Sequence, residues 1–169
     1  MKNITPNMVD ALPVSASKIY NPKNYLFICI SLIVVIACAL ALGLAGLDTS
    51  GAVYYLVAFV GAIGLAVLLY YAIGGEKVYR TADGKMLKEK ELYYANGSAR
   101  ALYEALSKSD TAELAKLMPI AEGGVRLDLL YDPDLQFGVA QVNAYEPYQY
   151  YAYEQVVKLD AATLKAVLK

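Results

Sequence analysis

The stretch YLFICISLIVVIACALALGLAGL, residues 25–47, decides the fold class, because it carries no charged side chain from end to end. A second uncharged stretch, AVYYLVAFVGAIGLAVLLYYAI, follows at residues 52–73. A helix needs about 20 apolar residues to cross the hydrocarbon core of a bilayer, and both stretches are long enough. Only DTSG, four residues, separates them. The two stretches therefore predict an antiparallel transmembrane hairpin.

Basic residues flank this hairpin but avoid its tip. They are Lys2, Lys18 and Lys23 before the first stretch, and Lys77, Arg80, Lys85, Lys88 and Lys90 after the second. Positively charged residues stay on the cytoplasmic side of a membrane. We therefore expect both termini to be cytoplasmic.

The two cysteines, Cys29 and Cys38, lie inside the first stretch, nine residues apart. That separation along one helix is too large for a disulfide. VIAC, residues 35–38, has the form of a lipoprotein cleavage box, but the residues after it stay apolar instead of becoming a polar tether. We expect neither lipidation nor a disulfide framework.

Small residues recur four apart within both predicted spans. They are Ala37, Ala41 and Ala45 in the first and Ala58, Ala62 and Ala66 in the second. Such stripes let helix backbones approach closely in lipid. One interpretation is that the two stripes pack the hairpin against itself, and the other is that one stripe packs a second copy or a partner.

The segments outside the spans divide into an arm and a domain. Residues 1–24 contain three prolines and no sustained period, so we expect a loosely structured or peripherally packed cytoplasmic arm. Residues 76–169 carry 12 Lys and Arg against 14 Asp and Glu, which is typical of a soluble domain. This length suffices for a modest core of its own.

The pattern within residues 76–169 predicts an α+β domain with a mainly antiparallel sheet in the order β-β-α-α-β-β-β-α. KVYRTADGKMLKEKELYY predicts a hairpin around an Asp-Gly turn at residue 83. Two helices follow, with caps at Ser98 and near Ser109 or Asp110. GGVRLDLLYDPDLQFGVAQVNAY predicts a second hairpin, YQYYAYEQVVKL a last strand, and DAATLKAVLK a helix capped by Asp160.

No pattern in the chain indicates catalysis, a metal or a cofactor. Histidine is absent, which removes the commonest general base and the commonest transition-metal ligand. Neither a phosphate-binding glycine loop nor a nucleophile elbow occurs. DPD, residues 132–134, could hold a weakly bound cation, but such a sequence is usually only a turn. We expect a protein that is not an enzyme and binds neither metal nor cofactor.

The segment NAYEPYQYYAYEQ, residues 143–155, places five tyrosines within nine positions. Residues alternate between the two faces of a strand, so Tyr145, Tyr151 and Tyr153 should share one side and Tyr148 and Tyr150 the other. The same alternation continues to Val157 and Leu159, which predicts that Tyr151 and Tyr153 face the core and that Tyr148 and Tyr150 face solvent. The candidate partner surface is Tyr145, Tyr148 and Tyr150.

Four interpretations of the tyrosines stay open: ordinary sheet surface, a protein-docking patch, contact with lipid headgroups, and stacking on nucleic acid. Tyrosine suits half-buried strands and also protein interfaces. Nucleic acid is disfavoured because Glu146 and Glu154 flank the segment where basic residues would be needed. We expect no nucleic-acid partner.

ELYYANGSARALYEALSKSDTAELAKL and VRLDLLYDPDLQFGVAQVNAYEPYQY, which cover most of the domain, together resemble a group of small two-span membrane proteins of Bacteroidales-type bacteria. The most specific part is AQV followed by the Y-x-PY-x-Y pattern. The resemblance implies a bacterial inner membrane, and neither an activity nor site residues come with it.

The expected function follows from these features. A two-helix anchor holds a small cytoplasmic domain, which binds a protein partner or self-associates. The alternative is an accessory subunit of a transporter or envelope-synthesis complex, whose chemistry belongs to another chain.

Overall fold

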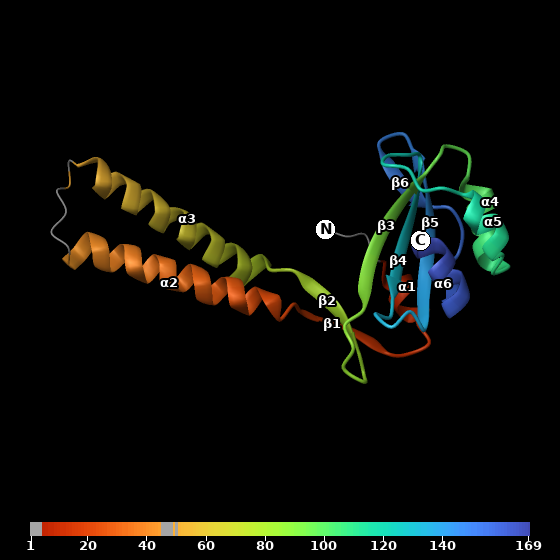
Figure 1. Ribbon diagram of the computed structural model, residues 1–169, viewed down its shortest axis with the longest axis horizontal. Helices are drawn as coiled ribbons and strands as arrows, with labels where there is room; N and C mark the ends of the chain where they lie inside the picture. Colours follow the sequence, from red (N-terminus) through yellow and green to blue (C-terminus); the bar gives the residue numbers. More distant parts are fainter. Residues whose placement is uncertain (1–4, 45–48, 50) are drawn as a thin grey trace. The chain divides into compact units, whose positions relative to one another are not determined.

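The computed structural model describes residues 5–44, 49 and 51–169. The chain divides into two compact units (Figure 1). The hairpin unit is Lys18–Val78, and the sheet unit joins Met1–Ser17 to Tyr79–Lys169. The sheet unit is therefore built from both ends of the chain, and the hairpin unit is inserted between them.

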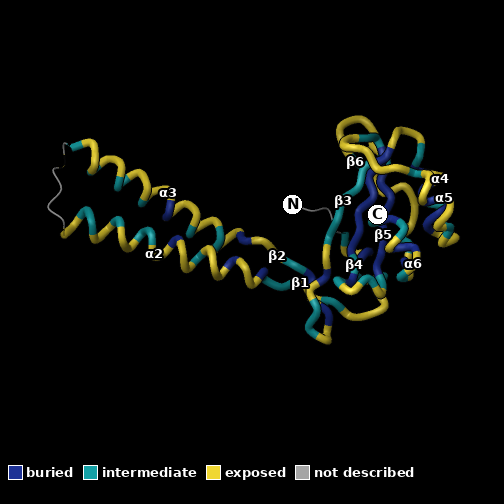
Figure 2. The backbone as a smooth tube through the Cα atoms, in the orientation of Figure 1, coloured by how far each residue is buried: buried dark blue, intermediate teal, exposed yellow. Residues whose placement is uncertain are grey.

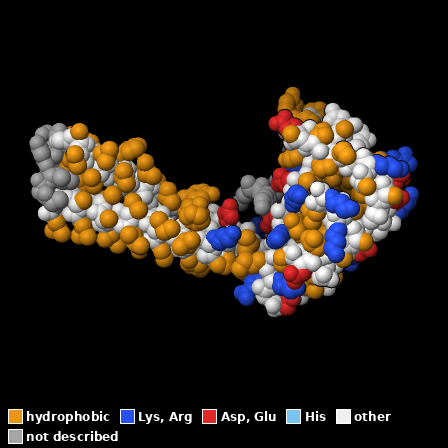
Figure 3. Space-filling view, in the orientation of Figure 1, with side chains coloured by type: hydrophobic (Ala, Val, Ile, Leu, Met, Phe, Trp, Pro, Cys, Tyr) orange, Lys and Arg blue, Asp and Glu red, His pale blue; other side chains and the backbone are white. Residues whose placement is uncertain are grey.

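Two long apolar helices form most of the hairpin unit. Helix α2 is Lys23–Leu44 and helix α3 is Ala52–Gly74. Hydrophobic side chains cover both helices on the face shown in Figure 3. Only 6% of the most apolar window of each helix is buried within the protein, whereas the core helix of a soluble protein would be mostly buried. Two helices of this length and composition indicate membrane association, and the two predicted apolar helices are confirmed; residues 45–47 lie outside the described residues.

A five-stranded antiparallel sheet forms the centre of the sheet unit. The strands are β3 (Lys88–Tyr94), β4 (Val125–Tyr131), β5 (Phe137–Glu146), β6 (Gln149–Ala152) and β7 (Val157–Asp160). The neighbour order is β3-β4-β5-β6, and β7 also pairs with β5. Strand β6 pairs with residues 143–146 and β7 with residues 137–140 of β5. The α+β class with a mainly antiparallel sheet is confirmed.

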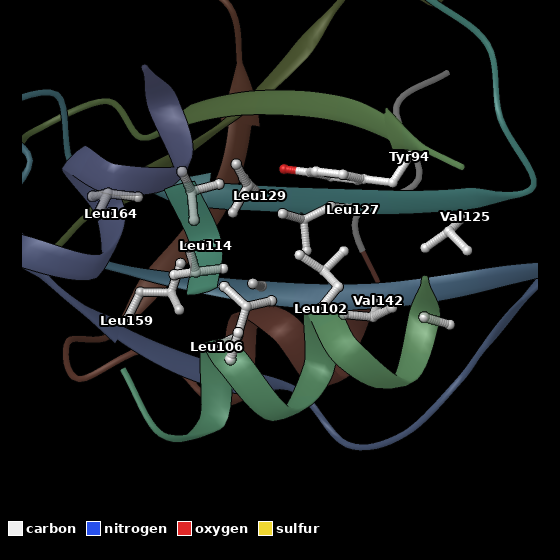
Figure 4. Close-up of a cluster of buried hydrophobic side chains, with 14 residues drawn as sticks. Tyr94, Leu102, Leu106, Leu114, Val125, Leu127, Leu129, Val142, Leu159 and Leu164 are labelled. Carbon is white, nitrogen blue, oxygen red and sulfur yellow. The ribbon is translucent and has the colours of Figure 1, made fainter. Parts of the chain in front are cut away.

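Three helices cover one face of this sheet: α4 (Ala99–Ser107), α5 (Thr111–Lys116) and α6 (Ala161–Leu168). Alternate residues of β4, namely Val125, Leu127 and Leu129, point toward them, as expected for a strand. They meet helix residues such as Leu102 and Leu164, both fully buried (Figure 4). Strands β4 and β5 are accordingly the most buried segments in Figure 2.

The predicted helix starts agree with the structure. Asp110 caps α5 by accepting bonds from the backbone N–H groups of Ala112 and Glu113. Asp160 caps α6 by accepting from the backbone N–H of Thr163. Ser98 precedes α4 as expected, but its hydroxyl donates to the Ala95 carbonyl and not to the helix start.

The expectation of a loosely structured or peripheral arm is wrong for its described part. Residues Pro6–Asp10 form helix α1, and Met8 is fully buried against Leu130 and Val139 on the second face of the sheet. Strands β4 and β5 carry these large apolar side chains on the sheet face opposite α4–α6. Helix α1 packs on that face and shields them from water.

The first predicted hairpin is also corrected. Strand β2 (Lys77–Thr81) pairs with β1 (Ala16–Tyr20) in a separate two-stranded sheet. The Asp-Gly turn does form, with Gly84 at a φ of 93°, but past it the chain makes only an isolated bridge between Arg80 and Met86. Strand β3 then leaves to pair with β4.

Candidate interaction surface

The tyrosine-rich segment is a hairpin, not a single strand. Tyr145 of β5 lies directly opposite Tyr150 of β6, and Glu146 lies opposite Gln149. Pro147 and Tyr148 form the turn between them. Proline fixes its own backbone near a φ of about −65° and cannot donate to the ladder, which ends β5 here. Strand β6 then stops at Ala152, and β7 is a separate strand.

Tyr148 occupies an unusual backbone conformation at the tip of this turn. Its φ is 81°, in the left-handed region that favours glycine, and its side chain is 96% exposed. A bulky residue there costs about 1–2 kcal/mol. The turn therefore projects an aromatic ring into solvent at a position where glycine would be less strained. Hydrophobic side chains gather at the end of the sheet where this turn lies, at the top of Figure 3.

Tyr150 is the half-buried support of the hairpin. Its hydroxyl donates to the Gly123 carbonyl at 2.5 Å, and its ring lies 4.7 Å from the Arg126 guanidinium carbon. The ring also packs edge-on against Tyr145, with centroids 5.2 Å apart, and against Tyr93 at 6.2 Å. The prediction that Tyr150 faces solvent with Tyr148 is wrong, because the turn places Tyr150 on the same face as Tyr145.

A buried ion pair holds Arg126 beneath these rings. Arg126 Nε and Nη2 lie 2.8 and 3.0 Å from the two carboxylate oxygens of Asp128, and the Asn143 amide donates to Asp128 at 2.9 Å. Burial raises the pKa of the Asp128 carboxyl, and the bonds from Arg126 and Asn143 oppose that rise. The charge-assisted hydrogen bond from Nη2, together with the close approach of Nε, holds the guanidinium beside Asp128. Sequence reasoning missed the pair, although Arg126 and Asp128 stand two apart on one strand and so share a face.

Tyr151 and Tyr153 are exposed, contrary to the prediction that they belong to the core. Their exposed fractions are 45% and 39%. The ring of Tyr153 meets Tyr103 of α4, with centroids 6.3 Å apart, and the Tyr151 hydroxyl bonds to Gln149. Tyr151 does lie on the same sheet face as Val157 and Leu159, because all three are opposite even-numbered residues of β5, but it is exposed there. Tyr153 lies past the end of β6.

The docking hypothesis therefore rests on four exposed rings around one hairpin, Tyr145, Tyr148, Tyr151 and Tyr153, which we call the tyrosine surface. Tyr145 lies on one face of the sheet, Tyr151 on the other, and Tyr148 at the turn between their strands. Exposed Ile120 lies beside Tyr93, the ring that packs against Tyr150, since the Ile120 N–H donates to the carbonyl of Tyr93 at 2.8 Å. Three glutamates nearby are exposed: Glu122 in the loop before β4, Glu146 at the end of β5 and Glu154 just after β6. Within the described part of the chain, no ion pair to any of the three is recorded. The surface is aromatic and acidic.

The alanine stripes coincide only in part with the helix seam of the hairpin unit. Ala37, Ala62 and Ala66 are exposed, Ala41 and Ala58 are half-buried, and Ala45 lies outside the described residues. The close approach occurs instead at Gly61 and Gly64. A Cβ added to Gly61 would lie 3.1 Å from Cys38 Cβ, and one added to Gly64 would lie 3.2 Å from a Val34 methyl. The interpretation that both stripes pack the hairpin against itself is wrong for Ala37, Ala62 and Ala66.

A set of polar contacts, which we call the polar clasp, joins the two helices where α2 begins and α3 ends. Asn24 donates its side-chain amide to the Glu76 carbonyl at 2.8 Å, and the Asn21 backbone N–H donates to the same carbonyl at 2.9 Å. Only glycine fits at position 75, because a Cβ there would lie 2.5 Å from the Asn24 amide nitrogen and clash with it. The clasp fixes the start of α2 against the end of α3.

The DPD segment holds a lysine and not an open cation site. The Lys85 ammonium lies 2.7 Å from an Asp134 carboxylate oxygen and 3.6 Å from Asp132. The bond to Asp134 raises the pKa of Lys85. Among the described residues, no group of three or more His, Cys, Asp or Glu side chains could hold a metal ion.

Comparisons with known proteins add no name to this geometry. No protein-family model, curated protein or solved structure matches the chain. The resemblance to small two-span membrane proteins stays a prediction, and the function must be argued from the residues themselves.

Proposed function

We propose that this chain is a membrane-anchored interaction protein of a bacterial inner membrane, whose sheet unit binds a protein partner in the cytoplasm. The observation that carries the proposal is the tyrosine surface, four exposed rings on a hairpin whose base is fixed. Clustered exposed apolar side chains mark interaction sites more often than scattered ones do, and these four rings cluster around one turn.

The construction of the surface supports docking. Tyrosine supplies a large contact area and has few rotamers to lose on binding. Tyr150 is already bonded to Gly123 and stacked over Arg126, so the hairpin does not have to be ordered by the partner. Preorganisation of this kind lowers the entropic cost of association. The strained turn at Tyr148 is consistent with selection for an exposed ring at the tip.

The alternative proposal is an accessory subunit of a transporter or envelope-synthesis complex. One observation favours it: Ala37, Ala62 and Ala66 are exposed on helices that carry no charge between Tyr25 and Leu44 or along α3. Small residues on a lipid-facing surface allow close packing of a helix from another chain. In this case the partner would contact the hairpin unit as well as the tyrosine surface.

The test is photo-crosslinking in intact membranes. Benzoylphenylalanine placed at position 148 should give a discrete crosslinked product, whereas the same group at exposed Lys108, just past the end of α4, should not. Mass spectrometry then identifies the product. A second copy of this chain indicates self-association, and a membrane complex that is also captured from position 62 indicates the accessory-subunit role. Equal, diffuse labelling from positions 148 and 108 would refute the docking role of the tyrosine surface.

A further inference from the structure

The outer edge of β6 offers unpaired backbone groups beside the tyrosine surface. The Tyr145 N–H donates to the Gly124 carbonyl at 2.7 Å, which directs the main chain of Tyr145 toward β4. In an antiparallel pair, residues alternate between those that exchange hydrogen bonds and those that do not. Tyr145 and Tyr150 are therefore a non-bonded pair. It follows that Tyr150 and Ala152 direct their N–H and C=O groups away from β5.

No described strand pairs with that outer edge. Natural sheets protect such edges with charged residues, lysine above all, or cover them with another segment. The outer strand β3 carries Lys88 and Lys90, and Ile120 bridges its end at Tyr93. Strand β7 carries Lys158. Strand β6 reads QYYA and has no charged residue, so it is the edge that lacks this protection.

The charge around the β6 edge is negative. Glu146 ends β5 opposite the start of β6, Glu154 follows β6 by two residues, and Glu122 is next to the Gly123 carbonyl that Tyr150 binds. Two basic side chains near the hairpin are already paired, Arg126 with Asp128 and Arg100 with Glu104. A ligand that binds this edge would meet carboxylates and aromatic faces, both of which attract cations.

We propose that the outer edge of β6 accepts an extended segment of a partner protein, rich in lysine or arginine, as an added antiparallel or parallel strand. The inference rests on the proposed docking role and names the chemistry of the partner. Main-chain hydrogen bonds to Tyr150 and Ala152 supply the pairing. Basic side chains on the segment bind the flanking glutamates and the tyrosine rings.

Two other occupants fit the edge less well. A second copy of the same edge would bring the glutamates of both copies together, and like charges across a strand pair are destabilising. Four residues of strand would also bury far less than the roughly 1,000 Å² expected of a stable interface. An anionic membrane surface would be repelled by the same glutamates.

The test uses the full-length protein in nanodiscs of phosphatidylcholine, which has no net charge. The probe is a fluorescein-labelled peptide about ten residues long that alternates lysine with threonine, and its control alternates glutamate with threonine. Fluorescence anisotropy should show the lysine peptide binding at least about tenfold more tightly than the glutamate peptide. Equal affinities, or tighter binding of the glutamate peptide, would overturn the proposed chemistry.

Two sets of variants separate the edge from the charge. Ala152→Pro removes an outward N–H and should reduce affinity for the lysine peptide by about tenfold or more, whereas Ala152→Ser keeps the N–H and should bind as the wild type does. Glu146→Gln combined with Glu154→Gln leaves the backbone intact and should also reduce affinity, by about three- to tenfold. Far-UV circular dichroism verifies that each variant is folded. Unchanged binding in a folded Ala152→Pro protein overturns the edge, and unchanged binding in the glutamine variant overturns the role of the glutamates.

Failure of this inference can be told apart from failure of the proposed function. If the peptides do not discriminate but position 148 still crosslinks one protein in membranes, the tyrosine surface docks its partner by side chains alone and the added strand is wrong. If chain-to-chain crosslinks form through position 148 and disappear in Ala152→Pro, the occupant is a second copy and the basic segment is wrong. If neither peptide nor protein is captured, both proposals fail.

Discussion

Tyr150 is the residue on which the conformation of the hairpin depends. Its hydroxyl bonds to Gly123, and its ring lies between Tyr145, Tyr93 and Arg126. Tyr151, its neighbour in the same strand, is 45% exposed. Two adjacent tyrosines in one short strand thus have different roles, one as support and the other as surface.

Serine substitutions should separate these roles. Tyr150→Ser removes a ring from three packing partners and should lower the free energy of unfolding by about 2–3 kcal/mol, below the value for a fully buried ring because Tyr150 is half-buried. Tyr151→Ser should lower it by less than about 1 kcal/mol. Thermal unfolding of the full-length protein in detergent measures both. A larger loss for Tyr151→Ser than for Tyr150→Ser would contradict the register of β5 and β6.

Tyr94 gives the sheet unit a dependence on alkaline pH. Its side chain is 3% exposed in the core, and burial raises its pKa to about 12 from 10.0. In the unfolded chain the hydroxyl loses its proton from about pH 10, whereas the folded chain keeps it until about pH 12. The unfolded state therefore binds fewer protons in this window, and stability falls as the pH rises through it.

Tyr94→Phe should remove that fall. Each unit of pKa difference corresponds to about 1.4 kcal/mol, so the wild type should lose about 2 kcal/mol more than the variant between pH 10 and pH 12. Denaturant unfolding followed by far-UV circular dichroism measures the difference. Tyr148→Phe, at an exposed position, serves as the control and should follow the wild type. Parallel curves for the wild type and Tyr94→Phe would show that Tyr94 does not resist ionisation.

At the scale of single residues, the sequence was sufficient for positions with a local signal. The caps Asp110 and Asp160 follow from short-range hydrogen bonding and were predicted. The face of Tyr150 and the exposure of Tyr151 and Tyr153 were not, because they depend on where the chain turns and on which part of the sheet the helices cover. Pro147, which ends β5, did indicate a turn. Tyr148 gave no such indication, because tyrosine does not favour the left-handed conformation that it adopts here.

At the scale of elements, the hairpin unit shows how two apolar helices choose their contact face. Nearly every residue along such helices is hydrophobic, the polar exceptions in α2 being Lys23, Asn24 and Ser31, so composition alone marks little of the seam. The structure places Gly61 and Gly64 there, where Cβ atoms would crowd Cys38 and Val34. The alanine stripes share the spacing of a packing motif, but Ala37, Ala62 and Ala66 are exposed away from this seam.

Leucine substitutions test the seam directly. Gly61→Leu should overpack it, destabilise the hairpin by about 1–3 kcal/mol and expose Cys38. Ala62→Leu, at the next and exposed position, should be nearly silent. The readout is the rate at which N-ethylmaleimide labels Cys38 in detergent, with exposed Cys29 as the reference in the same chain. Faster labelling of Cys38 in Ala62→Leu than in Gly61→Leu would place the alanine stripe at the seam after all.

The elements that sequence reasoning assigned well are those with strong periodicity. Both apolar helices, the helices α4, α5 and α6 and the strands β4 and β5 were predicted from their patterns. Helix α1 was not, because five residues are too few to show a period. The partners of β2 and β3 were not, because strand pairing between distant segments depends on packing of the whole unit.

At the scale of the whole molecule, the two ends of the chain form one folded unit. Met8 packs against Leu130 and Val139, so the segments on either side of the two apolar helices share a core. If both helices cross a bilayer, this shared core requires the N-terminal and C-terminal segments to lie on the same side. An even number of crossings is therefore favoured by packing within the sheet unit as well as by the short link between the helices.

Reporter fusions decide which side that is. Because Lys77, Arg80 and Lys85 follow the second helix and the segment between the helices has no basic residue, we expect the sheet unit in the cytoplasm. Alkaline phosphatase, which is active only in the periplasm, should be inactive when fused after Lys169 and active when inserted between residues 48 and 51. The reverse pattern would move the sheet unit outside and make the charge argument wrong, while leaving the hairpin intact. Activity at both positions would contradict the hairpin itself, because a core shared by Met8 and Leu130 cannot be divided by a membrane.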